Sequence, residues 1–107
     1  MNPRNENPLL LLAAVREKLI ATGLAKNLYD HEPKIVLMVE GTEGQYEIHT
    51  PSGKLYYDED PSDGYFANTS KKLSDLLPHI VGVVVKWHGG MKEFHTVEAL
   101  SVWAFSE

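Results

Sequence analysis

The chain opens with a polar stretch, which is followed by a hydrophobic run that predicts a helix. Residues 1–6 are polar without periodicity, and we expect them to form a flexible tail. The side chain of Asn7 can cap a helix, and Pro8 suits the first helical position, where its missing N–H removes no hydrogen bond. The pattern predicts a helix from Pro8 to about Thr22, with Gly23 as the residue that ends it.

Three short segments with strand patterns follow the helix. Lys34–Glu40 is rich in β-branched residues, Gln45–Thr50 alternates apolar and polar side chains, and Lys54–Tyr57 comes directly after a second turn. The turns Gly41–Gly44 and Pro51–Gly53 suit connections between neighbouring antiparallel strands. The pattern therefore predicts a three-stranded meander.

An acidic loop and a short helix come next. Asp58–Ala67 contains Pro and Gly among its acidic residues and has no hydrophobic periodicity, which is typical of a loop. Thr69 or Ser70 can cap a second helix. That helix is expected to end at Leu77–Pro78, because a helix rarely continues past the residue before a proline.

The last third of the chain predicts a hairpin. Ile80–His88 has a strand pattern and leads into Gly89–Gly90, a strong signal for a two-residue turn. From Met91 the chain is expected to return as one or more strands that reach Phe105. With this turn, three favourable side-chain pairs lie directly opposite each other: Trp87 with Lys92, Lys86 with Glu93, and Val85 with Phe94.

Together these elements predict a single α+β domain over residues 7–107. The order is helix, three strands, helix, two strands, with a mainly antiparallel five-stranded sheet and two helices. Ile35–Val39 and Ile80–Val85 are apolar without alternation, which is typical of strands covered on both faces. Two short helices cover little of a sheet, so we expect a second copy of the chain or another protein to cover the remainder, unless one helix lies on each face.

The first helix carries more apolar surface than one face can bury. Four consecutive leucines, each about 100° further round the helix, cover about 300° of its circumference; they are Leu9, Leu10, Leu11 and Leu12. We therefore expect part of this helix to pack in an intermolecular interface. The alternative is that the short sheet curls round the helix and buries all four within one chain.

The amino-acid composition and net charge exclude some kinds of site and disfavour some kinds of partner. The 107 residues include no Cys, which excludes disulfides, thiolate nucleophiles, iron–sulfur clusters and zinc sites based on Cys. The formal net charge of −5 disfavours binding to nucleic acid phosphates or to anionic membranes. No apolar run approaches the roughly 20 residues that span a bilayer, and no signal peptide is recognised. We expect a cytoplasmic location and no membrane anchor.

The acidic loop is a candidate contact surface. It does not fit a calcium loop, because in a loop that starts at Asp58 the glycine Gly64 falls at the seventh position instead of the sixth. Aromatic residues flank its carboxylates, and such a combination suits contact with a protein. The candidate interface residues from the helix, the loop and the hairpin are Leu9, Leu10, Leu11, Leu12, Tyr57, Asp58, Asp60, Asp63, Tyr65 and Trp87.

No motif predicts a catalytic residue, a metal site or a cofactor. The five His residues lack the spacings of zinc ligands, and the chain has no nucleophile elbow, phosphate loop or dinucleotide fingerprint. His88, His95 and Glu98 share the predicted hairpin, but Glu98 is expected on the face opposite to both histidines. Acid–base chemistry within one chain therefore has little support.

A nucleic-acid function is a third hypothesis. Helix, three strands and helix over residues 8–77, with Lys71–Lys72 opening the second helix, resembles the layout of double-stranded-RNA-binding domains, and the resemblance implies contact with an RNA backbone. The second helix is short, two more strands follow, and the acidic loop would repel phosphates. The same loop carries too few charges to imitate nucleic acid. We expect no nucleic-acid partner.

The excess of apolar surface and the absence of catalytic motifs predict a non-enzymatic protein-association module. It would self-associate through the Leu-rich helix, or bind a protein partner through the acidic loop or an exposed face or edge of the sheet. The alternative is a small enzyme whose active site forms between subunits from His and carboxylate residues. The size and charge balance are also common among small bacterial and phage assembly or inhibitor proteins.

Overall fold

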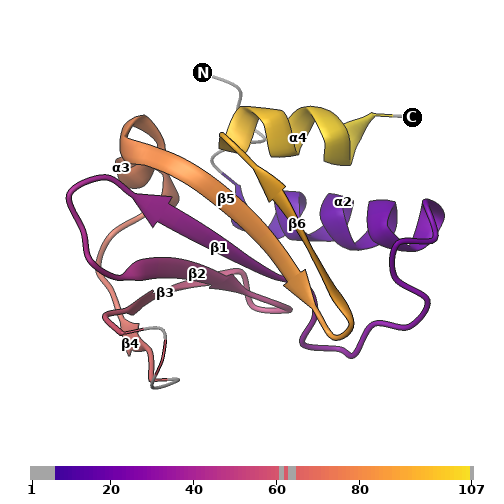
Figure 1. The fold of residues 1–107 in the computed structure, drawn as a ribbon, viewed down its shortest axis with the longest axis horizontal. Coiled ribbons are helices and arrows are strands. Elements are labelled where there is room, and N and C mark those ends of the chain that lie inside the picture. The colour runs from indigo at the N-terminus through magenta and orange to yellow at the C-terminus, as the bar shows by residue number, and fades with distance from the viewer. Residues whose placement is uncertain (1–6, 61, 63–64, 107) are drawn as a thin grey trace.

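The described chain forms one antiparallel sheet with α-helices packed on one of its two faces (Figure 1). The computed structural model describes residues 7–60, 62 and 65–106; the predicted tail, residues 1–6, lies outside them. Within these residues the elements are α2 (Pro8–Ala21), β1 (Lys34–Val39), β2 (Gln45–His49), β3 (Lys54–Asp58), β4 (Ala67–Asn68), α3 (Leu73–Leu76), a 3-10 helix (Leu77–His79), β5 (Ile80–Trp87), β6 (Gly90–Phe94) and α4 (Val97–Phe105). The α+β class is confirmed, with one strand and one α-helix more than expected.

The first helix begins and ends close to where the sequence predicts. The Oδ1 atom of Asn7 accepts hydrogen bonds from the backbone N–H groups of Leu9 and Leu10, at 3.1 and 3.2 Å. Two N–H groups that have no partner within the helix are satisfied in this way. Just beyond the helix Gly23 adopts a φ of 75°, a left-handed conformation that glycine reaches without strain.

The sheet has six antiparallel strands in the order β4-β3-β2-β1-β5-β6 among the described residues. The predicted meander is confirmed, since β2 pairs with both β1 and β3. After β4 the chain crosses to the other side of β1, and the long strand β5 pairs there along the full length of β1. The two strands predicted to be the most buried therefore lie side by side in the middle of the sheet.

The predicted second helix is reduced to one turn. α3 begins after Lys72, and not after Thr69 or Ser70 as predicted. The Oδ2 atom of Asp75 accepts a hydrogen bond from the N–H of Lys72 at 2.9 Å, which fixes this start. Before it, Ala67–Asn68 form the short strand β4, in which Ala67 pairs with Tyr57 of β3, and Thr69–Lys71 connect this strand to the helix.

The hairpin between β5 and β6 turns earlier than predicted. Its loop is His88–Gly89, and Gly90 is already the first residue of β6, opposite Trp87. In this register the loop position with a left-handed backbone, φ 98°, falls on Gly89, and the indole ring of Trp87 packs against Gly90, where a Cβ atom would lie 2.7 Å from Cζ2. Each residue of β5 faces a partner two positions earlier than expected, and the three predicted pairs are wrong. The observed pairs are Lys86 with Met91, Val85 with Lys92, and Val84 with Glu93.

The segment predicted as a last strand is the helix α4. The hydroxyl of Thr96 accepts a hydrogen bond from the N–H of Ala99 at 3.0 Å and caps the helix. Its buried side chains have helical spacing; they are Val97, Leu100, Ser101 and Ala104. The helix packs on α2 and on the β5–β6 hairpin. Burial at this spacing outweighs the strand preference of the β-branched and aromatic residues in the segment.

All three α-helices of the described chain pack on one face of the sheet. Figure 1 shows α2 and α4 side by side, with α2 passing behind the β5–β6 hairpin and α4 beginning beyond the end of β6. Ile35 and Leu37 point toward the helices and are fully buried, whereas Val36 and Val84 point the other way and are absent from that core. None of the described helices has the length and apolar character needed to cross a membrane.

A pair of truncations on α4 tests how the helix is held. Leu100→Ala removes a fully buried side chain from the contact with α2 and the sheet, and should lower the free energy of unfolding by about 2–5 kcal/mol. Val102→Ala on the same helix truncates an exposed side chain and should change it by less than about 0.5 kcal/mol. Urea unfolding followed by circular dichroism measures both, and equal losses would contradict the described packing.

Candidate functional site

The face of the sheet that points away from the helices is called the open face here. Strand pairing arranges its side chains in rows that run across the strands. The central row consists of Tyr56, Glu47, Val36, Val84 and Glu93. A second row, nearer one end of the strands, consists of Lys54, His49, Lys34 and Lys86. The sequence pattern predicts a pair of Lys86 with Glu93, which the observed register separates, and it predicts no functional site for the charged members of either row.

Glu47 is the buried charge at the centre of the open face. Its side chain is only 2% exposed, although no described helix covers it. One carboxylate oxygen, Oε1, lies 2.9 Å from Nε2 of His49 and 3.4 Å from Nζ of Lys34. The other, Oε2, accepts a hydrogen bond from the amide of Gln45 at 3.1 Å. Both oxygens are therefore engaged by neighbouring side chains.

These contacts keep Glu47 ionised. Burial alone would raise the pKa of its carboxyl group, but the hydrogen bonds from His49 and Gln45 and the charge of Lys34 hold that pKa below the ordinary value of 4.5. The ionised carboxylate in turn fixes the positions of the lysine and the imidazole. Aromatic rings hold the imidazole from its other side, with the centroids of Tyr56 and Phe66 at 4.5 and 4.7 Å.

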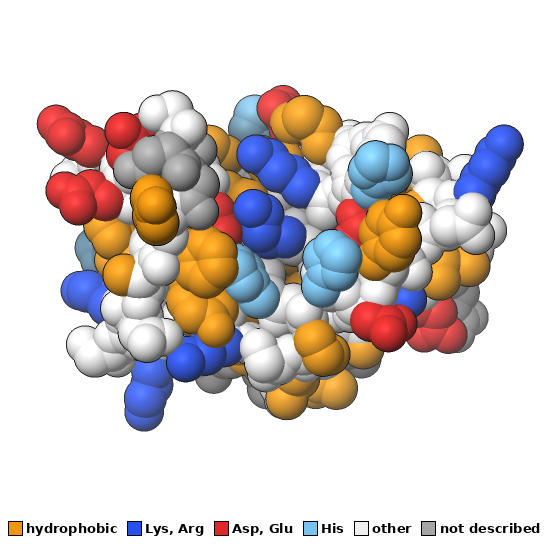
Figure 2. All heavy atoms as spheres, turned by 90° about the horizontal axis from the view of Figure 1, so that it is seen from below, with side chains coloured by type: hydrophobic (Ala, Val, Ile, Leu, Met, Phe, Trp, Pro, Cys, Tyr) orange, Lys and Arg blue, Asp and Glu red, His pale blue; other side chains and the backbone are white. Residues whose placement is uncertain are grey.

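A cleft opens at the end of the lysine-containing row. It is a cavity of about 370 Å³, within the usual size of small-molecule sites. Its lining comes from the loop before β1, from the ends of β1, β2 and β5, and from the residue after β2: His31, Glu32, Lys34, His49, Thr50, Lys86 and Trp87. Figure 2 shows this side of the molecule, with basic and histidine side chains gathered near its middle and acidic ones toward its flanks.

Glu32 lines the cleft from the loop before β1 and is buried. One carboxylate oxygen accepts a hydrogen bond from the N–H of Tyr29 at 3.0 Å, and the other accepts one from the N–H of His88 in the hairpin turn. Burial opposes ionisation, but these two backbone hydrogen bonds lower the pKa of Glu32 below 4.5. The guanidinium group of Arg16 donates to the carbonyl of Tyr29 at 2.9 Å and so ties the same loop to α2.

The four leucines of the first helix separate into two pairs. Leu11 and Leu12 are buried in the core, whereas Leu9 and Leu10 are 55% and 51% exposed. Within one chain, therefore, only half of this apolar run is buried. Leu9 also lies against the backbone of Gly53, where a Cβ atom would come within 2.8 Å of the leucine side chain.

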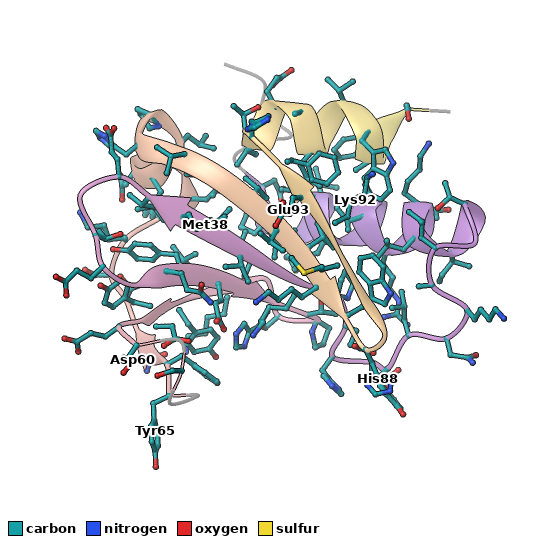
Figure 3. All side chains as sticks on the ribbon, in the orientation of Figure 1. Met38, Asp60, Tyr65, His88, Lys92 and Glu93 are labelled. Atoms are coloured by element: carbon teal, nitrogen blue, oxygen red, sulfur yellow. The ribbon has the colours of Figure 1, made fainter. Side chains whose placement is uncertain are left out.

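The other candidate interface residues are not brought together with the helix. Asp58 is buried at the end of β3, and the ring of Tyr57 packs on Tyr46 in the core, with 4.9 Å between centroids. Trp87 lines the cleft. Tyr65 is 80% exposed at the far end of the sheet from His88, as Figure 3 shows.

In the acidic loop itself, hydrogen bonds from Ser62 fix the position of the Asp60 carboxylate. It accepts hydrogen bonds from the hydroxyl and the N–H of Ser62, at 2.6 and 3.0 Å, and these lower its pKa below 3.8. Asp63 lies outside the described residues. The loop therefore presents at least one fixed carboxylate to solvent.

The histidines do not assemble a common site. His31 and His49 line the cleft, whereas His95 lines a different cavity of about 340 Å³ at the other end of the open face. Within residues 7–60, 62 and 65–106, no group of three or more His, Asp or Glu side chains is placed to hold a metal ion. Comparison with protein-family models, with curated proteins and with solved structures finds no match.

The ionised carboxylate of Glu47 predicts a pH-dependent stability. Because its pKa is lowered in the folded state, its contribution is complete above the ordinary value of 4.5 and is lost as the pH falls through the lowered value. Glu47→Gln should lower the free energy of unfolding near neutral pH by about 1–3 kcal/mol, since it leaves Lys34 and His49 without their anion.

Urea unfolding near neutral pH and at about pH 3 measures this contribution. The loss of stability on acidification should be smaller in Glu47→Gln than in the unmodified protein. The control is Glu43→Gln, which changes an exposed side chain in the β1–β2 turn and should leave the loss unaltered. The same loss in all three proteins would show that Glu47 is not held as described.

Proposed function

We propose that this chain is a non-enzymatic protein-association module that self-associates through the open face of its sheet. One observation carries the proposal: every described α-helix packs on the same face, so the opposite face is left for a partner. Antiparallel sheets with one solvated face usually alternate apolar and polar side chains. Here the central strands instead carry Val36 and Val84 on that face.

The apolar side chains of the open face support this proposal. Val36 and Val84 are nearly inaccessible under their longer neighbours, while Met38 is 36% exposed and Met91 is 53% exposed. Methionine side chains are flexible and adapt to the shape of a partner. Met38 and Met91 would form the hydrophobic part of the interface, with the charged row beside them as its polar rim.

Charge on the open face suits a second copy of the same chain. The face carries cations, including Lys86, and an anion, Glu93, on adjacent strands. In an interface with two-fold symmetry each patch meets the other patch of its partner, so a surface with both signs can complement itself. The edge strand β6 is less suited to pairing, because its charged residues oppose edge-to-edge association.

The exposed half of the Leu-rich helix is the competing interface. Leu9 and Leu10 lie on α2, away from the open face, and an assembly through them would leave that face unused. An enzyme with an active site between subunits remains the alternative function, and a cytoplasmic location remains a prediction.

Light scattering after size-exclusion chromatography, over a range of protein concentrations, tests the interface. The unmodified protein should have the mass of a dimer or larger assembly. Met38→Glu with Met91→Glu should shift it to the 12.0 kDa monomer, because two charges would be buried in the interface. Leu10→Glu and the matched control Val102→Glu, both at exposed helical positions, should leave the assembly intact.

Circular dichroism establishes that each variant is folded. A monomeric unmodified protein at every concentration would contradict self-association. Dissociation by Leu10→Glu, without dissociation by the open-face variant, would place the interface on α2 instead.

A further inference from the structure

We propose that the cleft at the end of the open face binds an oxyanion of charge −2, such as a phosphate monoester or a dicarboxylate. The inference goes beyond the proposed association and does not depend on it. It starts from the arrangement of positive charge in the sheet. Lys34 and Lys86 are direct partners on adjacent strands and lie on the same face. Like charges in this position destabilise a sheet.

The unfavourable arrangement continues into the neighbouring strands. The register of β1 with β2 places His49 opposite Lys34, and His49 in turn pairs with Lys54. Three lysines and a histidine therefore stand in one row. Local conflicts of this kind are expected at functional sites, where a ligand supplies the missing interaction.

Carboxylates near the cleft do not neutralise Lys86. The Oε1 atom of Glu47 is engaged by Lys34 and His49, and both oxygens of Glu32 accept backbone hydrogen bonds. Among the described residues, no carboxylate comes within ion-pair distance of Lys86, which is exposed. The lysine therefore presents an uncompensated ammonium group to the cavity.

The shape and lining of the cavity define the class of ligand. Lysines act as point charges toward phosphate and carboxylate groups, and the cleft holds two of them, Lys34 and Lys86, on one wall. His31 and Trp87 supply flat rings from the loop and from the hairpin. A volume of about 370 Å³ leaves room for a small body beside the anionic group.

A dianion bound between Lys34 and Lys86 would relieve their repulsion and so stabilise the folded protein, which thermal unfolding can measure. Thermal unfolding is compared in sodium phosphate, sodium succinate and sodium chloride at equal, low ionic strength. For the unmodified protein, phosphate or succinate should raise the midpoint temperature above that in chloride by about 4 °C or more. If only one of the two salts raises the midpoint temperature, the result identifies whether phosphate or a dicarboxylate fits the cleft.

Lys86→Gln should have two opposite effects. In chloride it should raise the midpoint, because it removes the repulsion from Lys34, and it should abolish the additional gain from the dianion. The matched control Lys71→Gln, at an exposed lysine outside the sheet, should change neither value. A variant that is more stable cannot have lost anion binding through failure to fold.

Fluorescence gives an independent readout of the cleft. The chain has two Trp residues, and Trp103 lies on α4, so a Trp103→Phe background reports Trp87 alone. Titration with inorganic phosphate should change this signal with saturation, and Lys86→Gln should weaken the apparent affinity at least about tenfold. The result that overturns the proposal is an equal response to phosphate, succinate and chloride, or a dianion response that Lys86→Gln retains.

Both measurements are made at one protein concentration whose oligomeric state is determined by light scattering. Saturable anion binding by a monomer would support the cleft and contradict self-association. Self-association without an effect of the dianions would support the interface on the open face and contradict anion binding in the cleft. The two proposals can therefore fail separately.

Discussion

The buried carboxylate of Glu47 is the interaction on which the open face depends. It sits in the second strand of a sheet whose described helices all lie on the other side, and it is held by Gln45, His49 and Lys34. A buried charge is costly unless its hydrogen-bonding capacity is satisfied, and here three side chains satisfy it. Those same contacts fix the lysine and the imidazole that enter the cleft. A single satisfied anion thus organises one end of this surface.

Local signals predicted the first half of the fold well. Asn7 and Pro8 define the start of α2, and Gly23 lies just past its end with the expected positive φ. The meander followed from β-branched runs separated by turns. In each case the decisive interactions lie within a few residues of sequence, so the pattern contains the information needed.

The second half depended on contacts that sequence spacing does not show. The sequence predicted a turn at Gly89–Gly90, whereas Gly90 lies in β6 opposite Trp87, whose indole ring packs where a Cβ atom of residue 90 would lie. In α4 the helical spacing of the buried residues and the capping residue Thr96 were present in the sequence. The β-branched and aromatic residues of that segment masked this signal.

The site was the least predictable part. In the sequence, Glu47 and His49 are only the polar half of an alternating strand, Lys34 only opens an apolar strand, and Lys86 is predicted to pair with Glu93. Their proximity follows from the register of three strands, including the pairing of β1 with a strand more than 40 residues later. The acidic loop had the more prominent sequence pattern, but in the structure it lies apart from the Leu-rich helix.

Methyl NMR of selectively labelled methionine addresses the open face most directly. The chain has only three Met residues, and two of them, Met38 and Met91, lie on that face. Substitution of each by Leu assigns the signals, and spectra are then recorded over a dilution series. Both open-face methyl resonances should move together as the assembly dissociates. Resonances that keep their positions while light scattering reports a change of mass would contradict self-association through the open face.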